Sequence, residues 1–224
     1  MKHAVFAGLG SMGWPMATNL RQAGLAVTGM DALATRAEAF NGAEHSTEDS
    51  PSGDDILANA DGLFVMVVNA EQVRAVLFDD GLYPGGLIQQ LKPGACVVQM
   101  STVAPADSAE LCRAVTDARP DLHYVDAPVS GGVVGAEAGS LTIMAAGSDE
   151  ALARCRPAFD ILGESLYEVG SRAGQGSTMK AVNQLLCGVH IAAAAEALSL
   201  AEHNGIDKAM MLALVQGSAA SSWM

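Results

Sequence analysis

Short apolar runs alternate with amphipathic stretches over the first three quarters of the chain. Most of the apolar runs end at Gly, Asp, Asn or Ser, which is typical of strands that are buried on both faces. This pattern predicts strands over 3–8, 25–30, 62–68, 95–100, 122–126, 141–146 and 165–169. It predicts helices over 13–23, 33–40, 54–60, 71–78, 105–117 and 149–161. Strands that alternate with helices at such short intervals favour an α/β fold, a doubly wound and mostly parallel sheet with helices on both faces.

The character of the sequence changes after Gly170. Residues 177–204 are rich in Ala and Leu and contain no Pro, and Gly188 is their only glycine, which predicts one long helix that ends at Gly205. A further helix is expected over 207–215, with an aspartate as its N-cap. Two helices cannot bury so apolar a stripe between them, so we expect another subunit or a further segment to cover it.

The domain organisation follows from this change of pattern. Residues 1–168 are expected to form a Rossmann-like α/β domain. Residues 169–224 are expected to form a long interdomain helix and the start of an all-α domain.

Three glycines with the spacing G-x-G-x-x-G join the first predicted strand to the first predicted helix. Gly8 permits a tight turn, Gly10 lets the backbone approach a pyrophosphate, and Gly13 lets the helix pack close to the strand. The free amides of the helix N-terminus would face the phosphate charge. Asp31 ends the next apolar run, where a carboxylate accepts hydrogen bonds from ribose hydroxyls and repels a 2′-phosphate, so NAD is favoured over NADP.

The other residues expected to contact the cofactor lie at the carboxyl ends of predicted strands, which face the ligand crevice of such a sheet. Thr102 follows one of these strands and could bind cofactor or substrate, or instead cap the helix that starts at Pro105. The full predicted set is Gly8, Leu9, Gly10, Ser11, Met12, Gly13, Asp31, Val68, Asn69 and Thr102.

Composition narrows the classes of function. The net charge of −13, from 12 basic and 25 acidic residues, disfavours nucleic-acid binding. No run of uncharged apolar residues approaches the roughly 18 that span a bilayer, and glycines interrupt the apolar N-terminus, so we expect neither a membrane segment nor a signal peptide. The four cysteines are far apart and lack histidines at ligand spacing, which predicts reduced thiols in a cytoplasmic protein and no metal site.

Four blocks in the expected order resemble the β-hydroxyacid dehydrogenase family. The first is the glycine-rich turn, Gly8–Gly13, which looks like the family's N-terminal signature. The others are Gln99–Val103, similar to the loop at the nicotinamide half, Asp126–Gly132, similar to the substrate-binding signature, and Gly174–Gln184, similar to the catalytic signature. Within the family the sequence looks closest to the branch of L-threonate dehydrogenases. The resemblance implies oxidation of a short hydroxy acid of three or four carbons by hydride transfer to NAD, in a homodimer or homotetramer. It also implies that residues 1–168 are the NAD-binding domain and that residues 169–224 contain the interdomain helix and a truncated part of the substrate or dimerisation domain.

The catalytic block contains the candidate proton-transfer residue. Lys180 lies on the first turns of the predicted long helix, and a lysine shielded from water near a helix N-terminus can act as base in oxidation and as acid in reduction. Asn183 and Gln184 follow at helical spacing on the same face, so either amide can hold the reacting hydroxyl. We favour Asn183 as the catalytic amide and assign Gln184 to substrate binding. A solvated lysine and an amide bonded to nearby backbone are the structural alternatives.

The substrate-binding block ends in Ser130, Gly131 and Gly132. A hydroxyl beside bare backbone amides can form a small anion nest for a substrate carboxylate. A structural glycine turn is the alternative.

Members of this family are usually longer at the C-terminus than this chain, and the additional part completes the helical domain. The nucleotide site is expected to be intact without it, whereas turnover depends on how the substrate side is closed. The alternative function is therefore a catalytically inactive NAD-binding module or oligomerisation partner.

Overall fold

The computed structural model describes residues 1–42, 56–78 and 86–222. The chain forms two compact units, Met1–Lys180 and Ala181–Met224. The structural boundary lies inside one helix, α9 (Gln175–His203), so the first turns of α9 belong to the first unit and the remainder to the second. The functional division expected at residues 168 and 169 stays a prediction.

The first unit contains eight strands among its described residues: β1 (His3–Ala7), β2 (Ala26–Met30), β3 (Gly62–Val65), β4 (Cys96–Gln99), β5 (His123–Asp126), β6 (Val129–Ser130), β7 (Leu141–Ala146) and β8 (Gly163–Gly170). The helices that connect them are α1 (Gly13–Gln22), α2 (Ala34–Asn41), α3 (Ile56–Asn59), α4 (Ala70–Phe78), α5 (Leu87–Gln90), α6 (Pro105–Ala118), α7 (Gly132–Ala138) and α8 (Asp149–Leu162).

The strands form one sheet with the order β2-β1-β3-β4-β5-β7-β6, and β8 pairs with β7. The five strands from β2 to β5 run parallel, and the pairs β5–β7 and β6–β7 are antiparallel. Because each parallel connection passes through a helix, the carboxyl ends of β1, β2, β3, β4 and β5 meet at one edge of the sheet. The predicted mostly parallel, Rossmann-like sheet is confirmed.

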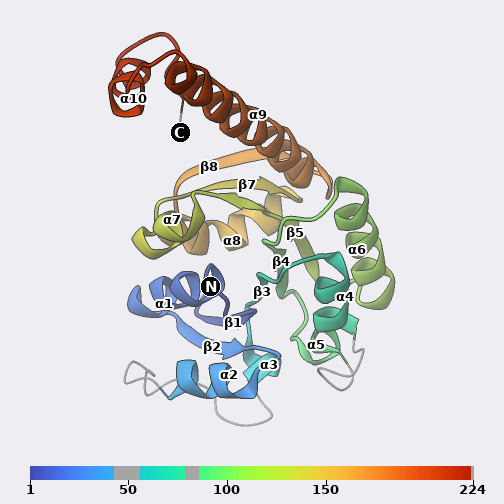
Figure 1. Ribbon diagram of the computed structural model, residues 1–224. Coiled ribbons are helices and arrows are strands. Elements are labelled where there is room, and N and C mark those ends of the chain that lie inside the picture. Colours follow the sequence, from blue (N-terminus) through green and yellow to red (C-terminus); the bar gives the residue numbers. More distant parts are fainter. Residues whose placement is uncertain (43–55, 79–85, 223–224) are drawn as a thin grey trace. The chain divides into compact units, whose positions relative to one another are not determined.

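Two hydrophobic cores cover the two faces of the sheet. Alternate strand residues point to opposite faces, so Val98 joins a core with α1 and α8 while its neighbour Val97 joins a core with α4, α5 and α6. Figure 1 shows α1, α7 and α8 on one side of the sheet and α4, α5 and α6 on the other. Both faces of the central strands are thus buried, which explains why these strands are apolar without alternation.

The predicted elements agree with the structure to within a few residues at most ends. Residues 54 and 55 of the predicted helix 54–60 lie outside the described residues. The short elements β6, α5 and α7 were not predicted from the sequence pattern. α7 begins at two glycines with positive φ, the N-cap Gly131 at +132° and the first helical residue Gly132 at +63°, and a segment of this kind resembles a loop in sequence.

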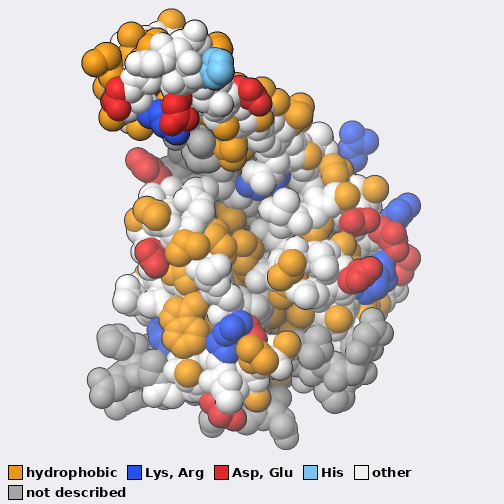
Figure 2. Space-filling view, in the orientation of Figure 1, with side chains coloured by type: hydrophobic (Ala, Val, Ile, Leu, Met, Phe, Trp, Pro, Cys, Tyr) orange, Lys and Arg blue, Asp and Glu red, His pale blue; other side chains and the backbone are white. Residues whose placement is uncertain are grey.

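The second unit contains the remainder of α9 and α10 (Lys208–Gln216), and Asp207 caps α10 through its side chain. In the described part of this unit Ala201 is the one buried residue. Leu185, Leu200 and Met210 are each more than half exposed, and Figure 2 shows hydrophobic side chains spread over α9 and α10. The predicted helices and their uncovered apolar surface are both present.

Among the described residues one helix, α9, is long and apolar enough to cross a membrane, with a mean hydropathy of 1.4 in its most apolar stretch. No membrane segment was expected from the sequence, because no run of uncharged apolar residues reaches this length. A single helix of this kind is weak evidence for a membrane, since helices of soluble proteins meet the same criterion.

Candidate active site

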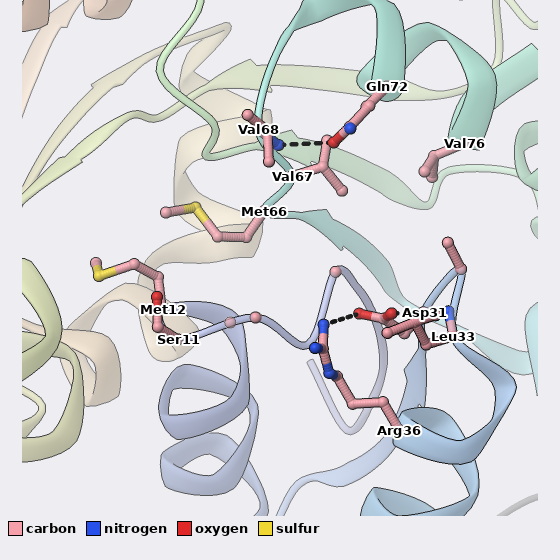
Figure 3. A pocket seen from close by; sticks show the side chains of 14 residues that line it. Ser11, Met12, Asp31, Leu33, Arg36, Met66, Val67, Val68, Gln72 and Val76 are labelled. Carbon is pink, nitrogen blue, oxygen red and sulfur yellow. Dashed lines mark hydrogen bonds and ion pairs between the residues drawn. The ribbon is translucent and has the colours of Figure 1, made fainter.

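A pocket of about 420 Å³ lies beyond the carboxyl ends of β1, β2 and β3. Figure 3 shows the glycine-rich turn and Asp31 on one side of it and the segment after β3 on the other. The lining residues are Gly8, Gly10, Ser11, Met12, Gly13, Asp31, Ala32, Leu33, Arg36, Met66, Val67, Val68, Gln72 and Val76. The structure therefore brings together predicted cofactor residues from three separate stretches of the chain.

The three glycines of the turn meet three different steric demands. Gly8 has φ +96°, and a Cβ there would lie 2.2 Å from the carbonyl oxygen of Met66. A Cβ at Gly13 would lie 1.8 Å from the carbonyl oxygen of Gly8, so α1 packs directly against the turn. A Cβ at Gly10 would meet nothing within 4 Å, and Gly10 lines the pocket. Gly8 and Gly13 are thus required by the fold, whereas Gly10 leaves space for a ligand.

The N-terminus of α1 opens at this turn. Its N-cap, Met12, makes no side-chain cap, and the first turn contains no acidic residue. The first-turn amides of a helix carry partial positive charge, so an uncapped helix start is a favourable place for a phosphate group.

Asp31 ties the turn to the end of β2. Its Oδ2 accepts a hydrogen bond from the backbone N–H of Leu9 at 2.8 Å, and its Oδ1 accepts one from Leu33 N–H at 2.9 Å. The guanidinium of Arg36 lies 3.5 Å from Oδ2. Each carboxylate oxygen has a second lone pair, so Asp31 can still accept hydrogen bonds from ligand hydroxyls. The carboxylate thus has a structural role, and its role in binding the ribose stays a prediction.

The opposite wall of the pocket is the segment after β3. Ser101 holds it in place, since its Oγ accepts a hydrogen bond from Val67 N–H at 2.8 Å. The N–H of Val68 donates to Gln72 Oε1 at 3.0 Å. Three predicted cofactor residues do not line this pocket. The side chain of Leu9 is buried in the hydrophobic core, Asn69 accepts a hydrogen bond from Gln72 N–H at the start of α4, and Thr102 is exposed in the loop after β4.

Lys180 lies on the second turn of α9 and is 6% exposed. A lysine is rarely that buried without a specific reason. Asn183 and Gln184 follow three and four positions later on the same helix, in the second unit. The Oδ1 of Asn183 accepts a weak hydrogen bond from the Cys187 thiol, with a sulfur–oxygen distance of 3.7 Å.

The predicted anion nest lies where β6 meets α7. Ser130 ends β6, Gly131 is the N-cap residue of α7, and Gly132 is its first residue. Both glycines are exposed and have positive φ. The structure shows an irregular, accessible backbone at this point, which is the property that the anion-nest hypothesis requires.

One buried residue beside the catalytic block was missed as a candidate. Asp126 ends β5, is fully buried, and accepts three hydrogen bonds from residues at the start of α9. The available signal was an aspartate at the end of an apolar strand, within the block that resembles the substrate-binding signature.

In the described part of the chain no group of three or more His, Cys, Asp or Glu could hold a metal ion.

Two family models together match nearly the whole chain. Residues 4–170 match the NAD-binding domain of 6-phosphogluconate dehydrogenase. Residues 174–224 match the NAD-binding family of NADP-dependent 3-hydroxyisobutyrate dehydrogenase.

Individual relatives extend over the same range. An L-threonate dehydrogenase of Escherichia coli K12 is 43% identical over 99% of this chain and 71% of its own length. An NAD-dependent L-serine dehydrogenase of Pseudomonas aeruginosa is 34% identical over 100% of this chain and 72% of its own length. A crystal structure of 3-hydroxyisobutyrate dehydrogenase from Salmonella typhimurium superposes with a TM-score of 0.84 at 41% identity, and covers 100% of this chain and 75% of that one. The chain therefore belongs to the β-hydroxyacid dehydrogenase family, as a dehydrogenase with an NAD-binding domain.

Proposed function

We propose that this protein oxidises a short hydroxy acid, L-threonate or a related acid of three or four carbons, with Lys180 as the proton-transfer residue. The support for the substrate is the 43% identity to an L-threonate dehydrogenase. The observation that carries the proton-transfer role is the burial of Lys180, at 6% exposure, on a helix whose start is fixed to the sheet.

The glycine-rich pocket fits the cofactor that the family uses. Gly10 leaves the backbone open to a pyrophosphate, the uncapped start of α1 favours its charge, and Asp31 offers carboxylate lone pairs to ribose hydroxyls. A 2′-phosphate would meet the negative charge of Asp31, so we propose NAD as the preferred form. When bound, oxidised nicotinamide accepts a hydride from the alcohol carbon.

In this proposal, residues of the chain itself transfer the proton and bind the substrate. As the alcohol becomes a carbonyl, the neutral amine of Lys180 accepts the hydroxyl proton, and in the reverse direction the ammonium returns it. The amide of Asn183 holds the reacting oxygen without competing for that proton, with Gln184 as a second amide on the same helix face. Ser130, Gly131 and Gly132 are proposed to bind the substrate carboxylate through a hydroxyl and backbone amides.

The test is a dehydrogenase assay with a panel of hydroxy acids. The purified protein is mixed with NAD or NADP and with L-threonate, L-serine, 3-hydroxyisobutyrate or 2-(hydroxymethyl)glutarate, and NADH or NADPH formation is followed by absorbance. We expect turnover with NAD and at least one of these acids, and a loss of at least about 10³-fold in kcat for Lys180→Ala with unchanged NADH affinity. Lys208→Ala is the matched control, since the Lys208 side chain is 55% exposed. Unchanged turnover in Lys180→Ala would reject the assigned role.

The same assay distinguishes the proposed dehydrogenase from the alternative function. Cofactor binding without turnover across the panel would favour an inactive NAD-binding module or oligomerisation partner.

We also propose that residues 169–224 form the substrate and dimerisation region and that the protein is a homo-oligomer, because the described part of the second unit leaves its apolar side chains uncovered. Cytoplasmic location and the lack of nucleic-acid or membrane partners stay predictions.

A further inference from the structure

The carboxylate of Asp126 lies at the end of β5 and is fully buried. Its Oδ2 accepts hydrogen bonds from the backbone N–H groups of Gly174 at 2.8 Å and Ser177 at 2.9 Å. Its Oδ1 accepts a third from the Ser177 hydroxyl at 2.7 Å. All three donors lie 48 to 51 positions further along the chain, immediately before and within the first turn of α9. A single side chain on the sheet thus holds the beginning of this helix.

Close backbone packing reinforces the contact. A Cβ at Gly176 would lie 2.5 Å from the carbonyl oxygen of Asp126 and 2.4 Å from that of Met144, so the first turn of α9 packs directly against the end of β5 and the middle of β7. Gly174 has φ +93°, and its Cβ would lie 2.8 Å from the carbonyl oxygen of Pro105. A larger residue at Gly176 would push the helix away from the sheet, and one at Gly174 would push the start of the helix away from α6.

The anchored turn leads directly to the lysine. Ser177 and Lys180 are three positions apart in α9, so they lie about one turn from each other on the same side of the helix. Any rotation or translation of the first turn therefore moves Lys180 with it. The turn that the three hydrogen bonds to Asp126 hold thus continues directly into the turn that carries Lys180.

Holding a helix start with a buried charged group costs more free energy than a neutral cap. Burying a carboxylate carries a large desolvation cost, which the three donors offset, whereas a local Ser, Thr or Asn could cap the helix without it. What the carboxylate adds is stronger, charge-assisted hydrogen bonds and a link to a strand that is distant in sequence. That strand belongs to the same sheet edge as the pocket, since Asp126 pairs with Gln99, Gln99 pairs with Val65, and Met66 after Val65 lines the pocket.

We propose that Asp126 is a positioning residue for Lys180. It fixes the first turn of α9 to the sheet edge that carries the cofactor pocket and so sets where the amine meets the substrate. The inference rests on the proposed function of Lys180. Misplacement of a reacting group by about 1 Å costs roughly 10²-fold in rate, so the loss of this anchor is expected to lower kcat far more than cofactor affinity.

The experiment compares Ser177→Ala, Asp126→Asn and a control, Ser108→Ala. Ser177→Ala removes one hydrogen bond and keeps the carboxylate with its two backbone donors. Asp126→Asn removes the charge and replaces one carboxylate oxygen by an NH₂ group, a donor that then faces the donors of Gly174 and Ser177. Ser108 is also a fully buried serine of the first unit, and its hydroxyl contacts the Tyr124 hydroxyl at 3.5 Å. We expect kcat to fall about 10-fold in Ser177→Ala and about 100-fold in Asp126→Asn, with the NADH Kd within twofold of wild type and no fall in kcat for Ser108→Ala.

A second measurement follows the lysine without turnover. Each protein is treated briefly with acetic anhydride, and acetylation of Lys180 and Lys208 is quantified by peptide mass spectrometry. Loss of the anchor should accelerate acetylation of Lys180 several-fold and leave that of Lys208 unchanged. If Asp126→Asn does not fold, Ser177→Ala decides the result, since it keeps the buried carboxylate.

The two proposals can fail separately. Full turnover in Lys180→Ala would reject the proton-transfer role, while the acetylation measurement still tests the anchor. An inactive Lys180→Ala together with wild-type kcat and wild-type acetylation in Ser177→Ala and Asp126→Asn would overturn the positioning role. An equal fall in kcat and NADH affinity, or a further fall when Ser177→Ala is added to Lys180→Ala, would show that Asp126 acts on the fold and not through the lysine.

Discussion

Alanine substitutions at Gly10 and Gly13 should separate cofactor binding from folding, although the two glycines belong to one motif. At Gly13 the new Cβ would lie 1.8 Å from the carbonyl oxygen of Gly8 and 3.0 Å from the Phe6 ring, so α1 must move by more than 1 Å. At Gly10 an added Cβ would meet nothing within 4 Å, and because Gly10 lines the pocket, this Cβ would extend into open space beside the pocket.

The magnitudes follow from this geometry. Overpacking a rigid site typically costs about 1–3 kcal/mol, and here the contact is with backbone, so we expect Gly13→Ala to lose about 3 kcal/mol of unfolding free energy despite the gain in helix propensity. Gly10→Ala should change the unfolding free energy by less than about 0.5 kcal/mol. Its methyl group would displace the pyrophosphate, and a 10- to 100-fold weaker NADH Kd corresponds to roughly 1.4–2.8 kcal/mol.

Urea unfolding followed by circular dichroism and NADH titration followed by fluorescence measure the two quantities. Gly188→Ala serves as the control, because a Cβ at this helical glycine would also meet nothing within 4 Å and Gly188 is remote in sequence from the turn. It should gain up to about 1 kcal/mol of stability with no change in NADH affinity. A Gly10→Ala protein that binds NADH as tightly as wild type, or a Gly13→Ala protein as stable as wild type, would refute the assignment of the two glycines.

Three further outcomes are expected. Asp31→Asn should reduce the ratio of kcat/KM with NAD to kcat/KM with NADP by at least about 10-fold, because the charge that repels a 2′-phosphate is lost while Arg36 stays in the pocket wall. In the control, adding Arg36→Ala to Asp31→Asn should abolish the increase in kcat/KM with NADP. Desolvation raises the pKa of Asp61, but hydrogen bonds from Lys2 N–H and the Lys92 ammonium outweigh it and bring that pKa to about 2. A lowered carboxyl pKa stabilises the fold above the unfolded pKa of about 4 and loses this effect toward pH 2, so the difference in urea midpoint between wild type and Asp61→Asn should be full at pH 7 and shrink steadily below pH 4. Finally, sedimentation equilibrium should show a dimer or tetramer at micromolar concentration, and a monomer would contradict the proposed assembly through the second unit.

The regular elements could be predicted from the sequence because their signals are local. An apolar run of strand length before a glycine-rich turn needs no distant information to be recognised, and β1, α1 and β2 lie within a residue or two of the predicted ranges. The elements that were missed depend on distant partners. β6 has only two residues, and what makes it a strand is its antiparallel pairing with Ile143 and Thr142 of β7.

The same distinction separates the parts of the site. The glycine-rich turn is one continuous segment, and even Asp31 follows it closely, so the sequence could predict that these residues lie together at one pocket. Asp126 is different, since its three donors lie some fifty positions away and only the folded chain brings them to β5. A sequence motif points to Lys180 as the proposed proton-transfer residue, whereas the contacts proposed to position it are encoded by no local pattern. For this reason we expect substitutions at Asp126 and Ser177, and not only those at Lys180, to determine how fast this dehydrogenase turns over.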